Sequence, residues 1–71
     1  MEKTEIIDKI AETIRIERLK KKLSQEKLAE LAGISIKYLN SIENQKVNPS
    51  ITVIVNICLA LDISLNKLME K

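Results

Sequence analysis

Apolar residues recur along this chain at steps of three and four positions, which is the period of an amphipathic α-helix. The first such face comprises Ile7, Ile10, Ala11 and Ile14, and Arg18 follows on the same face at the same spacing. It predicts a helix over residues 5–21, and acids near its start and lysines near its end suit the helix dipole. The chain holds one Gly and one Pro, so the residues that usually separate strands are scarce and helices are favoured throughout.

Two short helices are expected next, each introduced by a serine. Ser24 can cap a helix over residues 25–32, and Gly33 ends it because glycine readily adopts positive φ. Ser35 can cap a third helix over residues 36–44. The residues expected to point inward from these two helices are Leu28, Leu31, Leu39 and Ile42.

The remainder of the chain predicts two more helices. Asn48-Pro49-Ser50 breaks the chain and caps a helix over residues 51–61, and a short turn at residues 62–64 leads to a last helix over residues 65–70. The residues expected to fill the core from this region are Ile51, Ile54, Ile57, Cys58, Leu61, Ile63, Leu65 and Leu68. The predicted fold class is therefore all-α, with five helices in a compact domain.

The helix over residues 51–61 carries more apolar residues than one buried stripe can hold. Val53, Val55 and Leu59 should lie partly outside the core, with Met69 nearby. A domain this small cannot bury a helix on all sides, so a partner is expected to cover part of this surface. The simplest partner is a second copy of the chain, which gives a two-fold homodimer.

The 71 residues of the chain suffice for one small domain over residues 1–71. The net charge of +2 is compatible with a nucleic-acid partner but does not point to one, so the placement of residues has to carry that argument. No segment approaches the length of a membrane span, and the N-terminus does not look like a signal peptide. A soluble, cytoplasmic protein is therefore expected.

Composition also excludes several kinds of site. Cys58 is the only cysteine and the chain has no histidine, so neither an internal disulfide nor a zinc site is expected. Cys58 is interpreted as a small buried hydrophobe. There is no Gly-rich phosphate loop, no carboxylate cluster on one face and no base for Cys58, and the serines are accounted for as helix caps. We expect no enzymatic activity, no metal, no cofactor and no small-molecule ligand.

Residues 25–44 predict a helix-turn-helix, in which two short helices are joined by the turn Gly33-Ile34-Ser35. Ala29 is small where the two helices must approach closely, and Gly33 supplies the left-handed turn conformation. One side of the turn and third helix should be buried through Ile34, Leu39 and Ile42. The opposite side leaves Ile36, Lys37, Asn40 and Ser41 free to meet a partner.

This segment resembles the helix-turn-helix proteins of the phage repressor and Cro type, the XRE-like family. The matching stretches are SQEKLAELAGIS at residues 24–35, YLNSIEN at residues 38–44, NPS at residues 48–50 and ALDISL at residues 60–65, with Leu68 after them. The resemblance covers residues 7–69. It implies a lambda-repressor-like domain of five helices, with the helix-turn-helix at the second and third.

The resemblance implies that the third helix enters the major groove of double-stranded DNA. Carried over by position, the residues that would read base edges are Ser35, Ile36, Lys37, Asn40 and Ser41. Those that would contact phosphates are Gln25, Asn44, Lys46 and Asn48. Tyr38 could donate its hydroxyl to a phosphate or cover the turn with its ring, and Ile36 could meet a protein partner instead of a base. The run Lys20-Lys21-Lys22 could be a solvated helix end or a DNA contact.

A structural ion pair between Arg18 and Glu43 is also implied, and it would tie the first helix to the end of the third. The sequence departs from the family's pattern at two turns, where Lys22 and Gln45 stand in place of frequent glycines. Either these turns are strained, at a cost on the order of 1 kcal/mol each, or their geometry differs. In the second case Asn44 would take the left-handed position instead of Gln45.

The function implied by the resemblance is that of a sequence-specific transcriptional regulator, a repressor that binds a palindromic operator as a dimer. Compact members of the family include phage repressors, restriction-modification controller proteins and antitoxins. With no second domain for ligand sensing, such a regulator would act through its concentration and its occupancy of DNA. The alternative is a helical protein-interaction module, for example an antitoxin-like partner-binding domain, with weak or no specific DNA binding.

Overall fold

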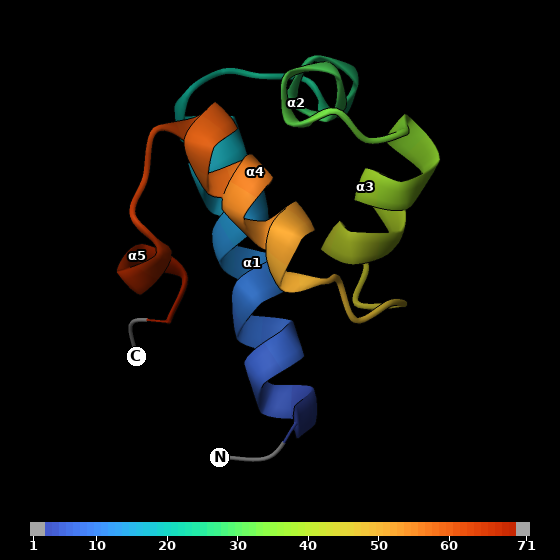
Figure 1. The fold of residues 1–71 in the computed structure, drawn as a ribbon, viewed down its shortest axis with the longest axis vertical. Coiled ribbons are helices and arrows are strands. Elements are labelled where there is room, and N and C mark those ends of the chain that lie inside the picture. Colours follow the sequence, from blue (N-terminus) through green and yellow to red (C-terminus); the bar gives the residue numbers. More distant parts are fainter. Residues whose placement is uncertain (1–2, 70–71) are drawn as a thin grey trace.

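The structure, a computed structural model, describes residues 3–69 and consists of helices joined by short turns. The helices are α1 (Lys3–Lys20), α2 (Gln25–Ala32), α3 (Ile36–Glu43), α4 (Ile51–Leu61) and α5 (Leu65–Met69). In Figure 1, α1 and α4 lie along the middle of the molecule, with α2 and α3 on one side and α5 on the other. The expected all-α class and the order of five helices are confirmed. Glu70, where the last helix was expected to end, lies outside the described residues.

Serine side chains fix where the helices after α1 begin. Each accepts a hydrogen bond from the backbone N–H three residues further on, at 3.0–3.3 Å. The four are Ser24, Ser35, Ser50 and Ser64. Such a cap satisfies one of the backbone donors that a helix leaves unpaired at its start. The predicted starts of α2, α3, α4 and α5 are therefore correct to the residue.

Four helices end in the same backbone motif, with one residue in the left-handed region. These residues are Lys22, Gly33, Gln45 and Asp62, with φ of 58°, 73°, 64° and 56°. In each case the next N–H donates to the carbonyl five residues back, as in Ile34 N to Ala29 O at 3.0 Å and Lys46 N to Ser41 O at 2.9 Å. The idea that Asn44 would replace Gln45 in the left-handed position is wrong, because Asn44 has φ of −94°.

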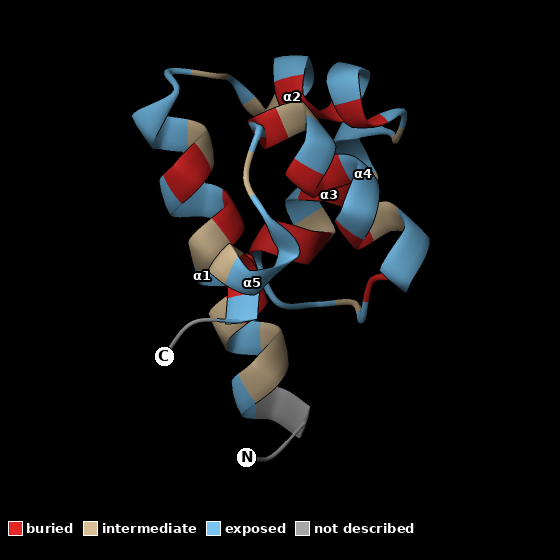
Figure 2. Ribbon diagram, turned by 60° about the vertical axis from the view of Figure 1, so that its left-hand side comes forward, coloured by how far each residue is buried: buried red, intermediate tan, exposed pale blue. Residues whose placement is uncertain are grey.

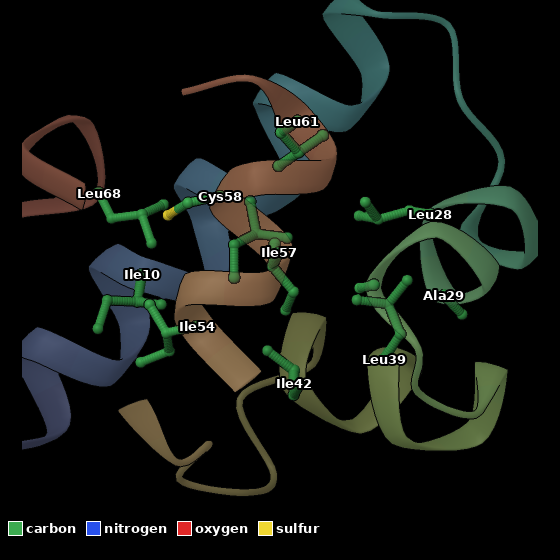
Figure 3. Close-up of a cluster of buried hydrophobic side chains, with 12 residues drawn as sticks. Ile10, Leu28, Ala29, Leu39, Ile42, Ile54, Ile57, Cys58, Leu61 and Leu68 are labelled. Atoms are coloured by element: carbon green, nitrogen blue, oxygen red, sulfur yellow. The ribbon is translucent and has the colours of Figure 1, made fainter. Parts of the chain in front are cut away.

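The core lies where the five helices meet, and α4 supplies its centre. Figure 2 shows that the buried residues lie on the sides of the helices that face the middle of the molecule. In Figure 3, Ile57 of α4 lies between Leu28 and Leu39 on one side and Ile10 and Leu68 on the other. The other core members are Ile14, Ala29, Ala32, Ile42, Ile54, Cys58 and Leu61. The inward positions predicted for α1 and α4 are thus largely correct.

Three residues expected in the core are on the surface. Leu31 is 50% exposed, Ile51 63% and Leu65 42%. Leu28, Ala29 and Ala32 form the buried side of α2, and the helical period places Leu31 away from that side. Ile51 and Leu65 each occupy the first position of a helix, where fewer neighbouring side chains cover them. The spacing of apolar residues in the sequence does not show how far the neighbouring helices extend, so it could not predict which of these positions stay uncovered.

No helix in the part of the chain that the structure describes is both long and apolar enough to cross a membrane.

Candidate nucleic-acid interface

Helices α2 and α3 pack against each other around the turn Gly33-Ile34-Ser35. Ala29 is only 2% exposed at the contact, which agrees with the need for a small residue there. Ile34 is half-buried against the core, and Leu39 and Ile42 are fully buried. These contacts hold α3 on the outside of the molecule with one face anchored and the other free.

The free face of α3 carries the residues predicted to read bases. Ser35, Ile36, Lys37 and Asn40 are exposed, and Ser41 is half-buried. The Ser35 hydroxyl oxygen accepts from Tyr38 N at 3.0 Å, so its hydrogen is still free to donate. Ile36 leaves 49% of its surface in solvent, so this face also offers an apolar side chain to a partner. The structure thus brings all five residues together on one surface.

A buried ion pair fixes the end of α3 to the end of α1. Arg18 Nε donates to Glu43 Oε2 at 2.8 Å and Arg18 Nη2 donates to Glu43 Oε1 at 3.0 Å, so the pair is bidentate. Arg18 Nη1 also donates to the carbonyl oxygen of Leu23 at 2.8 Å. The side chains are 11% and 2% exposed. The contact expected between Arg18 and Glu43 is therefore present.

Three amide side chains extend this pair toward the free face of α3. Gln25 Nε2 donates to Glu43 Oε1 at 3.1 Å, and Asn40 Nδ2 donates to Gln25 Oε1 at 3.3 Å. Asn44 Nδ2 then donates to Asn40 Oδ1 at 3.0 Å. We call Gln25, Asn40 and Asn44 the amide relay. The relay could not be predicted from the sequence, because contacts between residues 15 and 18 positions apart depend on how the helices cross.

The remaining residues predicted to contact phosphates lie in and after α3. Asn44, Lys46 and Asn48 are exposed in the segment between α3 and α4. Tyr38 is half-buried and packs against the core. Lys20, in the basic run at the end of α1, donates to Glu17 Oε2 at 3.3 Å.

The residues predicted at a dimer interface do not share one environment. Val53 is half-buried and packs against the core, whereas Val55, Leu59 and Met69 are 40%, 74% and 51% exposed. With Ile51, two of them form an exposed apolar row at four-residue steps along α4, which we call the α4 stripe: Ile51, Val55 and Leu59. An open groove beside Leu59 is also lined by Leu31 of α2.

Cys58 lies in the core, 5% exposed, and desolvation by burial raises the pKa of its thiol. This agrees with its interpretation as a small hydrophobe. Among residues 3–69, no group of three or more His, Cys, Asp or Glu side chains is placed to hold a metal ion.

Two solved structures share this arrangement. The restriction-modification controller protein C.AhdI from Aeromonas hydrophila matches with a TM-score of 0.84 and 35% sequence identity, over 87% of this chain and 94% of that one. The hypothetical transcription factor NHTF from Neisseria matches with a TM-score of 0.89 over 99% of this chain and 80% of that one. Its sequence identity of 24% makes this second match informative about the fold alone.

Sequence relatives and a family model agree with the structural matches. Control protein C.SmaI from Serratia marcescens is 34% identical over 62 residues, which are 87% of this chain and 74% of that protein. The transcriptional regulator SinR from Bacillus subtilis is 38% identical over 63 residues, which span only 57% of SinR. A family model described as helix-turn-helix matches residues 14–68. The chain therefore belongs to the XRE-type helix-turn-helix family, a family of DNA-binding transcriptional regulators and not of enzymes.

Proposed function

We propose that this protein is a sequence-specific transcriptional repressor that places α3 in the major groove of its operator. The observation that carries the proposal is the free face of α3, where Ser35, Ile36, Lys37, Asn40 and Ser41 lie together on a helix whose other face is buried. The bidentate contact between Arg18 and Glu43 supports it, because a fixed helix can present side chains to base edges in one register.

The chemistry of this face suits direct readout of bases. Lys37 can donate to O6 and N7 of guanine, and the apolar Ile36 can pack against the methyl group of thymine. Ser35 and Ser41 carry hydroxyls that can donate or accept. Contact with a methyl group in the groove would remove the exposed apolar surface of Ile36 from water, which is favourable.

Phosphate contacts would position the domain on the duplex. Gln25 has a second Nε2 hydrogen besides the one it donates to Glu43, and it stands at the N-terminus of α2, where backbone N–H groups favour an anion. Asn44, Lys46 and Asn48 would bind phosphates from the segment after α3, with Tyr38 as a further donor. These contacts carry no sequence information, but they make the affinity fall as salt concentration rises.

A homodimer that binds a palindromic site completes the proposal. The α4 stripe and Leu31 form an apolar surface on residues whose exposed fractions range from 40% to 74%. A second copy of the chain can bury that surface, and a two-fold dimer presents two copies of α3 to successive half-sites. The interface assigned from the sequence is thereby modified, since Val53 belongs mainly to the core, and Ile51 and Leu31 join Val55 and Leu59. Met69, 51% exposed at the end of α5, stays a predicted member of the interface.

The names of two relatives suggest a biological context. C.SmaI is called a control protein and C.AhdI a restriction-modification controller protein. We propose that this protein is likewise a transcriptional regulator of this kind, and that residues 1–71 form one DNA-binding domain.

Selection of bound sequences from a pool of random duplexes tests the proposal. Enrichment of a palindrome with two half-sites about one helical turn apart is expected. No enrichment at low salt, or weak binding that does not change with salt, would contradict it and favour a protein-interaction module. The groove lined by Leu31 and Leu59 would then be the surface to examine for a protein partner.

A further inference from the structure

The amide relay has a direction that Glu43 imposes. A carboxylate only accepts hydrogen bonds, so the Gln25 amide must turn its NH₂ group toward Glu43 Oε1. The Gln25 oxygen then faces Asn40, so the NH₂ group of Asn40 must donate to it, at 3.3 Å. Asn40 Oδ1 is left facing Asn44, whose NH₂ group donates to it at 3.0 Å. Each amide is thus oriented by the one before it.

The origin of the relay is itself fixed. Glu43 is 2% exposed at its side chain and is held in a bidentate contact by Arg18. Rotation of the Glu43 carboxylate would misalign the first amide of the relay, and the bidentate contact with Arg18 opposes that rotation.

Counting donors and acceptors shows what Asn40 still offers to a ligand. Its NH₂ group has two hydrogens, of which one goes to Gln25, and its oxygen has two lone pairs, of which one goes to Asn44. One donor and one acceptor remain on an exposed side chain of the proposed reading face. In the major groove, adenine presents N7 as an acceptor next to the N6 amino group as a donor, and a single amide complements both. Guanine presents two acceptors instead.

We propose that Asn40 reads an adenine in the operator, and that Gln25 is a positioning residue that transmits the orientation imposed by Glu43 to the Asn40 amide. This inference rests on the proposed function. It adds the identity of one base in the operator and the structural reason why Asn40 prefers that base. Without Gln25, the Asn40 amide could turn over and exchange its donor and acceptor ends. Its preference for adenine over other bases should then weaken, although Asn40 itself is unchanged.

Site selection with three variants tests the inference. Asn40→Ala removes the reading amide, Gln25→Met removes the positioning amide at similar volume, and Asn66→Ala is a matched control on an exposed asparagine of α5. We expect Asn40→Ala to abolish the preference at one base pair of each half-site, and that base pair to carry adenine in the wild-type selection. Gln25→Met should weaken the preference at the same base pair and leave it intact at the others. Asn66→Ala should select the wild-type site.

Replacing the N7 atom of that adenine by carbon provides a readout that a merely structural role would not change. The wild-type protein should lose about tenfold in affinity for the modified duplex, the loss expected for one good base contact, whereas Asn40→Ala should bind both duplexes equally. Circular dichroism of each variant shows whether the fold is kept. Asn40→Ala changes an exposed side chain, so this arm stays informative even if Gln25→Met unfolds.

The outcomes separate this inference from the proposed function. If the wild-type protein selects no sequence, the proposed function is wrong and this inference with it. If it selects a site, but Asn40→Ala alters no position or alters one that does not carry adenine, only the present inference is wrong. A folded Gln25→Met variant with an undiminished adenine preference would contradict the positioning role.

Discussion

At the scale of single residues, the α-helices end at residues in the left-handed region of φ. One of these residues is glycine, which adopts that conformation readily, and others are strained in it. Gly33 adopts φ of 73° without a steric penalty, whereas Lys22 and Gln45 adopt similar values with a Cβ atom. The hydrogen bonds that end the helices are the same at all three positions. The backbone geometry is therefore set by the helix ends, and the side chains adapt to it.

Replacing either strained residue by glycine should stabilise the protein. For Lys22→Gly and for Gln45→Gly we expect the free energy of unfolding to rise by about 0.5–1 kcal/mol, because relief of the left-handed strain exceeds the added chain entropy of glycine. Urea denaturation of each variant measures the change. The control is Lys21→Gly, since Lys21 is not at positive φ and should lose stability. Equal losses in all three variants would contradict the assignment of strain.

Cys58 provides a second prediction at this scale. Because burial raises the pKa of its thiol, the unfolded chain loses this proton at a lower pH than the folded protein does. The contribution to stability is thus complete at neutral pH and declines as pH rises above about 8.5, the ordinary value for a thiol. Unfolding free energies measured between neutral pH and pH about 9.5 should fall for the wild type. They should fall less for Cys58→Val. If the unfolding free energies of the wild type and the variant change in parallel with pH, the thiol does not contribute to the pH dependence.

At the scale of secondary-structure elements, the contact between Arg18 and Glu43 joins α1 to α3. Both side chains are largely buried, so Arg18→Met leaves a carboxylate without its partner and should cost about 3–5 kcal/mol of unfolding free energy. Lys27→Met provides the control, because Lys27 contacts Glu30 in an exposed pair worth less than about 1 kcal/mol. Chemical denaturation measures the loss of unfolding free energy in each of the two variants. Similar small losses would show that the buried pair does not hold α3 in place.

Most of the element order could be predicted from the sequence, because local signals specify it. Serine caps mark the helix starts, and the spacing of Ala29 and Gly33 indicates a close contact followed by a turn. The surface position of Leu31 and Ile51 could not be predicted, since it depends on where the neighbouring helices lie. The amide relay was missed for the same reason. A polar residue on a helix does not show which residue of another helix it will meet.

At the scale of the whole molecule, the α4 stripe leaves a large apolar area in water. Leu59 is 74% exposed, the highest value among the large hydrophobic residues whose burial is described. Leu59→Glu should convert a homodimer to a monomer, because a charge would be buried at the interface. Sedimentation at micromolar concentration measures this. Leu19→Glu changes another exposed leucine, on α1, and should leave the dimer intact. A monomeric wild type would contradict the proposed interface.

The central claim is that α3 reads a base sequence, and the affinity of Lys37→Ala for DNA tests it most directly. Fluorescence anisotropy would compare wild type and variant on the selected duplex and on a scrambled duplex of equal length. We expect Lys37→Ala to lose about tenfold or more in affinity for the selected duplex, as for one base contact, and much less for the scrambled one. Equal losses on both duplexes would mean that Lys37 binds only phosphates. A wild-type protein that does not distinguish the two duplexes would contradict the account altogether.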